Sequence, residues 1–338
     1  MTELVFSSNF RNALSHFAGF GTAAMLEEAG QRGVRLSWSE DVEPKLVISG
    51  LQSDLQAVAA TVRSHAAVHA QPSSWVQKTC IVQGEKKSSE VGLFSPRIVT
   101  PASSDAWRTL YSERHTVQDL SVNAGWLDAM MLQALGEPAY WLLESDLKEP
   151  DRGASRWEMK TRNRGEDFTR NRLSKLADIV ADRTIDEILS GLRGDAVRDE
   201  VGKDSNSSRT GTGLTTPHPV DNALAWCALW GISWFRLIPR TRLQSFTPGA
   251  VPQDRVHPRK MCLPLTTTPT SPARLRRLLR SKAFNDTAFA FEGSLEQAAG
   301  ADVLRRAGVR GIVHFAVHVG GSQSAPERIV LSGYFNPI

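Results

Sequence analysis

Cysteine is scarce in this chain. Its 338 residues include three cysteines, Cys80, Cys227 and Cys262. A sparse, odd set of this kind excludes the disulfide framework of a small secreted domain and is typical of a reducing compartment. Long apolar runs are missing too, since no stretch of about 18 apolar residues occurs and the first ten residues carry no Lys or Arg. We therefore expect a cytoplasmic protein with neither a signal peptide nor a membrane span.

The motifs of nucleotide-dependent and nucleophilic enzymes are also absent. Gly202-Lys203 is followed by Asp204, where a phosphate-binding loop has Ser or Thr, and no Gly-x-Ser-x-Gly sequence occurs. His65 and His69 have the spacing of zinc ligands on a helix, but alanine stands where a metalloprotease places its glutamate. We expect no metal ion and no cofactor.

The overall composition of the chain is that of a globular protein. Hydrophobic residues make up 41% of the chain and charged residues 22%, and the length is sufficient for two domains. Helical and strand-like patterns occur in mixed order, which predicts an α+β fold of mixed helices and short antiparallel sheets. Residues 202–219 are rich in Gly, Ser, Thr and Pro and are the best candidate for a linker or long loop. We therefore predict one α+β domain over residues 1–201 and a second over residues 220–338.

Three segments have informative helical patterns. Residues 12–29 place apolar side chains on one arc, and Gly19 and Gly21 lower the helix propensity there, so another element must pack closely against them. Residues 220–232 are apolar nearly all round, which predicts a buried helix. Ser271 and the proline after it can begin a helix over residues 273–284, with leucines on one side and arginines on the other.

Positive charge is concentrated in two segments. Residues 151–175 contain eight basic and four acidic side chains, and residues 236–282 contain eleven basic side chains and one acidic side chain. The rest of the chain is acidic on balance, although the whole carries a formal charge of +4. Localised positive charge on an acidic background is typical of a surface that binds a polyanion, and nucleic acid is the leading candidate.

These two segments supply the candidate binding residues. Their guanidinium and ammonium groups would contact backbone phosphates, while an indole could stack on a base and amides could read base edges. The candidate phosphate contacts are Arg152, Arg156, Lys160, Arg162, Arg164, Arg170 and Lys175 in the first cluster, and Arg240, Arg242, Arg255, Arg259, Lys260, Arg274, Arg276, Arg277 and Arg280 in the second. The candidates for base stacking or base reading are Trp157, Asn163 and Asn171.

One enzyme-like pattern lies in the first cluster. Asp151 follows a proline, and Glu158 and Lys160 come after it in the order of the PD-(D/E)xK nuclease motif, in which two carboxylates hold a divalent metal. Only six residues separate the two acids, which is shorter than the usual gap. A metal-dependent nuclease is therefore an alternative to a non-catalytic binding protein.

Two blocks of the chain resemble a known family. The opening NFRNALSHFAGFGTAAMLEEAG with the following VRLSWSE, and the stretch WLDAMM followed by RWEMKTRNRGEDFTRNRLSKLADIVADR, are similar to large-subunit-type proteins of type I CRISPR interference complexes, notably those of type I-G (formerly I-U) systems. The resemblance covers about 80 residues, and residues 202–338 do not contribute to it. It implies a non-catalytic subunit of a Cascade-like ribonucleoprotein that contacts CRISPR RNA or target DNA, including the protospacer-adjacent motif, beside other protein subunits.

The leading hypothesis is thus a nucleic-acid-binding structural subunit with no membrane partner. Five phosphate contacts on a duplex would give a log–log dependence of affinity on salt with a slope of about −4.5. The rivals are the nuclease and a protein-only scaffold whose arginines bind an acidic partner.

Overall fold

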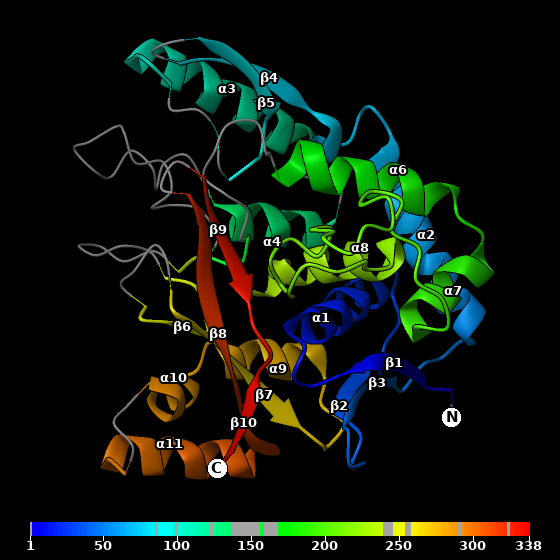
Figure 1. Ribbon diagram of the computed structural model, residues 1–338, viewed down its shortest axis with the longest axis vertical. Coiled ribbons are helices and arrows are strands. Elements are labelled where there is room, and N and C mark those ends of the chain that lie inside the picture. Colours follow the sequence, from blue (N-terminus) through cyan, green and yellow to red (C-terminus); the bar gives the residue numbers. More distant parts are fainter. Residues whose placement is uncertain are drawn as a thin grey trace.

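The computed structural model describes residues 2–338 except 85–86, 97, 99–100, 122–124, 137–155, 159–167, 239–245, 254–257, 290–292 and 323–324 (Figure 1). Helices and strands alternate irregularly, and every strand pair in the described part is antiparallel, which confirms the predicted α+β fold. None of the described helices is both long and apolar enough to cross a membrane. The elements of the first half are β1 (Leu4–Asn9), α1 (Ala13–Glu28), β2 (Arg35–Trp38), β3 (Lys45–Ser49), α2 (Leu55–Ala70), η1 (Trp75–Gln77), β4 (Thr79–Gln83), β5 (Ser88–Gly92), α3 (Ser104–Ser121), α4 (Trp126–Leu135), η3 (Thr169–Leu173), α6 (Ser174–Asp182) and α7 (Ile185–Arg193). Those of the second half are α8 (Asn222–Gly231), η4 (Ile232–Trp234), β6 (Ala250–Val251), β7 (Lys260–Thr266), α9 (Pro272–Leu279), α10 (Lys282–Phe289), α11 (Leu295–Arg306), β8 (Val309–Ser322), β9 (Ala325–Val330) and β10 (Tyr334–Pro337).

Helices α1 and α8 form the centre of the molecule and pack on each other with closely approaching backbones. The Asn12 side chain caps α1 by accepting the Leu14 N–H at 3.0 Å, and α1 is buried from its first residue to Leu26. A Cβ added to Gly21 would lie 1.8 Å from the Cys227 carbonyl oxygen, and one added to Gly231 would lie 2.1 Å from the backbone oxygen of α1 that faces it. Both the buried helix in residues 220–232 and the close contact at Gly21 are therefore confirmed.

Two antiparallel sheets flank this helical centre. The first has the strand order β1-β3-β2, and the second has the order β10-β8-β7-β6, with β9 paired to the outer part of β8. The sheets are joined where Leu36 and Thr270 exchange backbone hydrogen bonds of 2.8 and 2.9 Å. Strand β1 was not predicted, although the alternate burial of Leu4 and Phe6 has the period of two of a half-buried strand.

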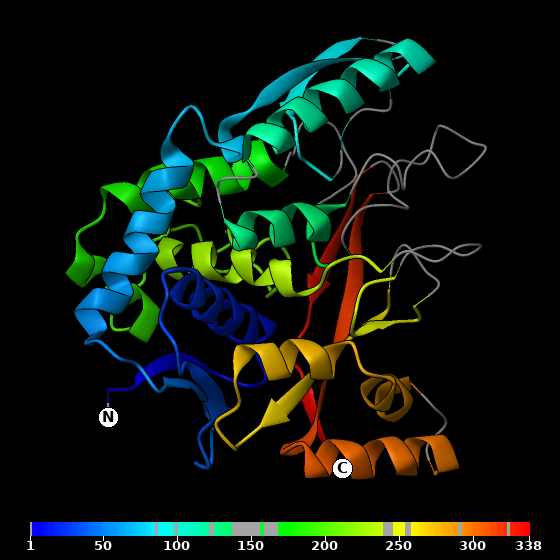
Figure 2. The ribbon, with the colours of Figure 1, turned by 180° about the vertical axis from the view of Figure 1, so that it is seen from behind.

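The remaining helices surround the centre. Helices α2, α6 and α7 pack together beside α8, and α3 with the β4-β5 hairpin lies at one end of the long axis (Figures 1 and 2). Helices α10 and α11 pack on each other at the opposite end, next to β8. After α8 the chain continues as η4 to Trp234, which is buried and stacks on Phe20 of α1.

The segment predicted as a linker or long loop, residues 202–219, is a packed loop. It is irregular, as expected, but Thr210, Thr212 and Leu214 are buried within it, at most 2% exposed. One continuous apolar cluster runs from Leu4 to Val330 and includes residues of both predicted domains. The packing of the described residues therefore gives no boundary between an N-terminal and a C-terminal domain.

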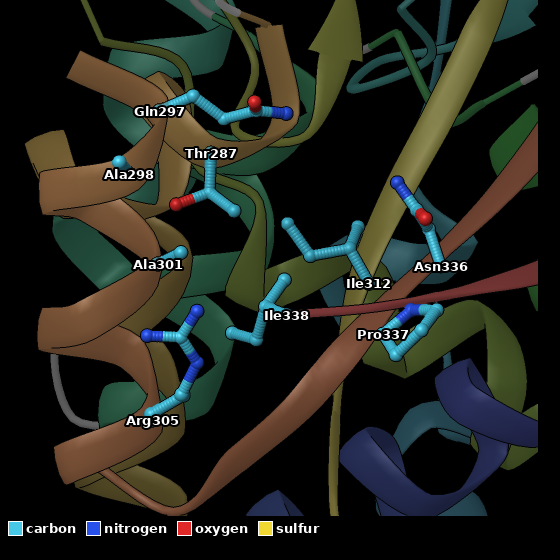
Figure 3. Close-up of a pocket in the computed structure, with 9 residues that line it drawn as sticks. All are labelled: Thr287, Gln297, Ala298, Ala301, Arg305, Ile312, Asn336, Pro337 and Ile338. Carbon is cyan, nitrogen blue, oxygen red and sulfur yellow. The ribbon is translucent and has the colours of Figure 1, made fainter. Parts of the chain in front are cut away.

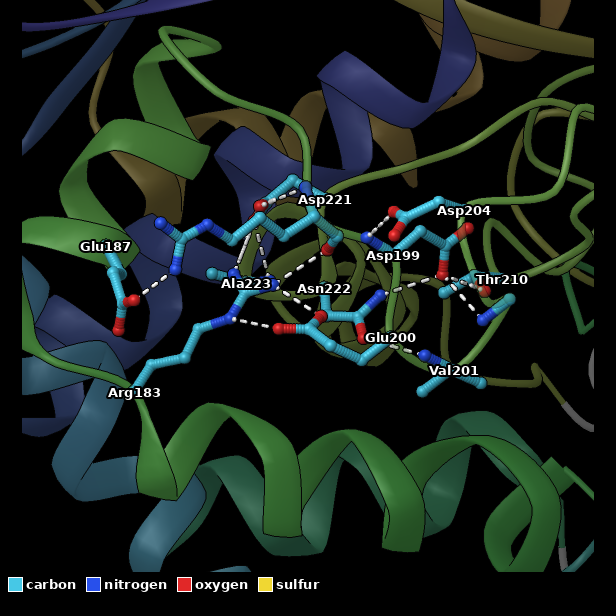
Figure 4. A network of polar contacts seen from close by, with 12 residues as sticks. Arg183, Glu187, Asp199, Glu200, Val201, Asp204, Thr210, Asp221, Asn222 and Ala223 are labelled. Atoms are coloured by element: carbon cyan, nitrogen blue, oxygen red, sulfur yellow. Dashed lines mark hydrogen bonds and ion pairs between the residues drawn. The ribbon is translucent and has the colours of Figure 1, made fainter.

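A buried ion pair anchors the start of this loop (Figure 4). The Arg183 guanidinium is 5% exposed and donates to both carboxylate oxygens of Asp221, at 2.9 and 3.0 Å, and to Glu200 at 2.7 Å. Asp221 also caps α8 by accepting the N–H groups of its first turn. Since removal of one partner of a buried pair leaves an uncompensated charge, this cluster holds α7, the loop and α8 in one arrangement.

Asp199 organises the rest of the loop (Figure 4). Its carboxylate accepts hydrogen bonds from the Thr210 hydroxyl at 2.6 Å, the Asn222 amide at 3.0 Å and the Gly202 N–H at 2.8 Å, and the Ser208 hydroxyl also donates to it. A Gly-, Ser- and Thr-rich sequence thus folds here around one buried acceptor instead of remaining extended.

His16 is expected to make the stability of the protein depend on pH. Its ring is buried in α1 and its Nε2–H donates to the Phe10 carbonyl at 2.8 Å. Burial lowers the pKa of His16 to about 4, although that hydrogen bond raises it. The folded state therefore binds this proton less readily than the unfolded chain does, so the free energy of unfolding falls as pH falls below about 6.5.

We expect His16→Gln, which keeps a donor for the carbonyl, to remove about 1.5 kcal/mol of the stability loss between pH 6.5 and 5. Urea unfolding curves of both proteins across that range measure the difference. Identical pH dependence in the two proteins would contradict this assignment.

Candidate nucleic-acid interface

Helix α9 carries the exposed arginines of the second basic cluster. The Ser271 side chain accepts the Arg274 N–H at 3.4 Å, and Pro272 occupies the first turn, as the sequence indicated. Leu275, Leu278 and Leu279 are buried on one side of the helix. The predicted helix over 273–284 is wrong in its length, because the Ser281 hydroxyl accepts the Phe284 N–H at 3.1 Å and begins α10 as a separate helix.

The opposite side of α9 is cationic. Arg274, Arg277 and Arg280 are exposed, and no carboxylate in the described part of the chain forms an ion pair with any of them. Arg276 differs, because its guanidinium is 2.8 Å from a carboxylate oxygen of Glu27 on α1. Three of the four helix arginines are therefore available to an external anion.

A fifth arginine from another segment joins this helix. The Arg236 guanidinium follows η4 and donates to the Gln133 side chain of α4 at 2.9 Å. Partial burial lowers the pKa of Arg236, and the charges of Arg280 and Arg276 lower it further. Like charges held this close repel one another, and a bound anion would relieve that repulsion.

An exposed indole lies beside these arginines. Trp126 is the first residue of α4 and is 37% exposed. The Arg276 guanidinium carbon lies 5.3 Å from the Trp126 ring centre and 5.2 Å from that of Trp234, and Trp234 in turn stacks on Phe20 at 4.5 Å. We use the term α9 surface for Trp126, Arg236, Arg274, Arg276, Arg277 and Arg280. Neither Trp126 nor Arg236 was among the candidates from the sequence.

The structure corrects two candidates of the first cluster. Arg156 is 1% exposed and Trp157 is completely buried, with its Nε1–H donating to the Pro248 carbonyl at 3.2 Å. The predictions of a phosphate contact at Arg156 and of base stacking at Trp157 are therefore wrong for this structure. The physical reason is that the segment carries the indole into the apolar core beside Phe235.

Other members of the two clusters have different surroundings. Arg170 forms an ion pair of 2.8 Å with Glu90, whereas Lys175 is exposed near the start of α6. Asn171 is half-buried in η3, and Arg259 and Lys260 are exposed where β7 begins.

The described helices of the first and second clusters lie at different levels of the long axis. Helix α6 and η3 lie toward the end occupied by α3 and the hairpin, and α9 lies in the other half of the long axis (Figures 1 and 2). Several candidates fall outside the described residues, namely Asp151, Arg152, Lys160, Arg162, Asn163, Arg164, Arg240, Arg242 and Arg255.

The nuclease pattern gains no support from its one described member. Glu158 is completely buried, and the Arg328 guanidinium donates to its backbone carbonyl at 3.2 Å. Asp151 and Lys160 lie outside the described residues, so the nuclease alternative stays a prediction.

The histidine pair of α2 also lies in the interior. The Nδ1 of His69 lies 2.9 Å from the Ser74 hydroxyl and its Nε2 lies 3.4 Å from Asp128, while His65 packs on Trp226 and Trp230. Burial raises the pKa of Asp128 to about 7. Within the described ranges, no three or more His, Cys, Asp or Glu residues are placed to hold a metal ion.

Two cavities open elsewhere on the protein. One of about 250 Å³ lies between α10, α11 and the paired strands β8 and β10, and both polar and apolar side chains line it, Arg305, Asn336 and Ile312 among them (Figure 3). The other, of about 410 Å³, lies at the start of α1 and is bordered by Arg11 and His218. No residue of the α9 surface lines either of them.

In comparisons with known proteins, the chain matches no family model, no curated protein and no solved structure.

Proposed function

We propose that this chain binds nucleic acid through the α9 surface. The observation that carries the proposal is the gathering of Arg236, Arg276 and Arg280 beside the exposed Arg274 and Arg277. Among the described residues, one ion pair involves these five guanidinium groups, and it joins Arg276 to Glu27. Binding of a sugar-phosphate backbone to a surface with this excess of positive charge is favourable, because it releases the counterions of the backbone.

We further propose that the protein acts as a non-catalytic subunit of an RNA-guided, type I CRISPR interference complex in the cytoplasm. The support is the resemblance of residues 9–30 and 34–40, and of residues 126–131 and 156–183, to large-subunit-type proteins, together with the basic surface described above. CRISPR RNA, target DNA and the other protein subunits of the complex are its proposed partners.

Salt dependence is the direct test of nucleic-acid binding. Four arginines are available, because Arg276 is engaged by Glu27. Four phosphate contacts give a plot of log affinity against log salt with a slope of about −3 on a single strand and about −4 on a duplex. Fluorescence anisotropy of labelled oligonucleotides at several salt concentrations measures this slope.

A slope near zero would overturn the proposal and leave the protein-only scaffold as the better explanation. The same titration with CRISPR repeat RNA and with an unrelated RNA of equal length tests the family placement. Tighter binding of the repeat RNA is expected, and equal binding of both would count against a role in an RNA-guided complex.

A further inference from the structure

We infer that the α9 surface binds single-stranded nucleic acid, with one unpaired base stacking on Trp126. This inference rests on the proposed function, since it specifies the form of nucleic acid that the same surface takes. It depends on the position of Trp126, on the exposure of its ring and on what surrounds it.

Trp126 is held in a fixed place by the start of α4. Gly125 has a φ of 114°, a conformation that favours glycine, and a Cβ at this position would meet a carboxylate oxygen of Glu28 at 2.1 Å. That same Glu28 oxygen accepts the Leu127 N–H at 3.1 Å, which attaches the first turn of α4 to the end of α1. The contact between α1 and α4 therefore fixes the backbone position of Trp126.

The exposure of Trp126 is exceptional in this protein. The other described tryptophans are at most 4% exposed, whereas Trp126 is 37% exposed. Leaving a large aromatic surface in water forgoes the free energy that its burial would supply. These buried tryptophans are Trp38, Trp75, Trp107, Trp157, Trp226, Trp230 and Trp234.

A series of contacts connects the Trp126 ring to the core of the protein. The Arg276 guanidinium carbon lies over both the Trp126 ring and the Trp234 ring, and Arg276 also forms an ion pair with Glu27. A base placed on Trp126 would extend this alternating stack outward from Phe20. Arg276 is thus a positioning residue for the indole and remains partly buried, with 22% of its side chain exposed.

The neighbours of Trp126 favour a nucleic acid over a protein partner. Indole and guanidinium groups also occur at protein interfaces, but the centre of such an interface is apolar. Arg274 and Arg277 on α9 and Arg280 at its C-terminal cap are exposed, and the Arg276 guanidinium lies 5.3 Å from the centre of the Trp126 ring, so the side chain described beside the ring is a cation. Stacking needs a base with a free face, and the bases of a duplex have both faces covered by their neighbours, so a single strand is the form that fits.

Two variants of Trp126 and two probes test this inference. Trp126→Leu keeps an apolar cover on Arg276 but has no aromatic face, and Trp126→Phe keeps an aromatic face. The probes are an oligothymidylate and the dA·dT duplex of the same length. We expect Trp126→Leu to bind the single strand about tenfold more weakly and the duplex as the unchanged protein does.

Trp126→Phe should bind the single strand within about threefold of the unchanged protein. Quenching of intrinsic tryptophan fluorescence by the single strand should nevertheless decrease in this variant, because Trp126 is the exposed one among the described tryptophans. This readout decides the question even if Trp126→Leu folds poorly, which thermal unfolding would reveal.

Equal weakening of both probes, or of neither, in Trp126→Leu would overturn the inference while leaving nucleic-acid binding by the arginines in place. Loss of a co-purifying protein subunit from this variant, with single-strand affinity unchanged, would overturn it in favour of a protein contact. A slope near zero in the salt titration would instead remove the proposed function itself.

Discussion

Simultaneous change of Arg274, Arg277 and Arg280 to glutamate is expected to weaken nucleic-acid binding about 100-fold at low salt. Each side chain is exposed on α9 and is not paired with a carboxylate in the described part of the protein. If each lost contact contributes about 1 kcal/mol, three together account for about two powers of ten in affinity. The magnitude of the salt slope should decrease by two to three as well, by about 0.7 per contact on a single strand and about 0.9 on a duplex.

A control of equal charge change separates a local contact from a general effect of net charge. Arg108, Arg193 and Arg306 are partly or largely exposed on α3, α7 and α11, and each already pairs with an aspartate near it in sequence. Their replacement by glutamate should reduce affinity much less than the α9 triple change does. Equal losses in the two triple variants would show that α9 is not the binding surface.

Gly21→Ala is expected to lower the free energy of unfolding by about 3 kcal/mol. The added Cβ would lie 1.8 Å from the Cys227 carbonyl oxygen and 2.9 Å from the Gly231 nitrogen, so α1 and α8 would have to separate. Overpacking of this kind against backbone atoms exceeds the ~1 kcal/mol that alanine gains over glycine in helix propensity. Urea denaturation followed by circular dichroism measures the change.

Gly30→Ala provides the comparison for this variant. Gly30 has a φ of 84° at the end of α1, and nothing lies within 4 Å of a Cβ built there. Its replacement carries the backbone strain of a left-handed residue, about 1–2 kcal/mol, without a steric clash. A smaller loss of stability in Gly21→Ala than in Gly30→Ala would contradict the close contact between α1 and α8.

Local patterns in the sequence were sufficient to predict the helices at the centre of the fold. The apolar arc and glycines of α1, the apolar surface of α8 and the Ser-Pro start of α9 each depend on residues within one or two turns. The leucine and arginine sides of α9 were predicted for the same reason. The capping box of Thr184 with Glu187 at the start of α7 is another local feature of this kind.

Which side chains of the candidate site are exposed depends instead on contacts between residues that are distant in the sequence. The charge pattern alone could not distinguish Arg156, which is buried, from Arg277, which is exposed. The same holds for Trp157 and Trp126, because burial of an indole is decided by tertiary packing.

The contact between α1 and α8 has a consequence for synthesis on the ribosome. Gly21 and the residues that it meets in α8 are separated by about 200 residues, so at 5–20 residues per second α8 follows α1 by roughly 10–40 s. During this interval the nascent chain must carry an apolar helix whose partner has not yet been made. Chaperone binding to the emerging N-terminal segment is the expected response of the cell, and the central helices can assemble only late in translation.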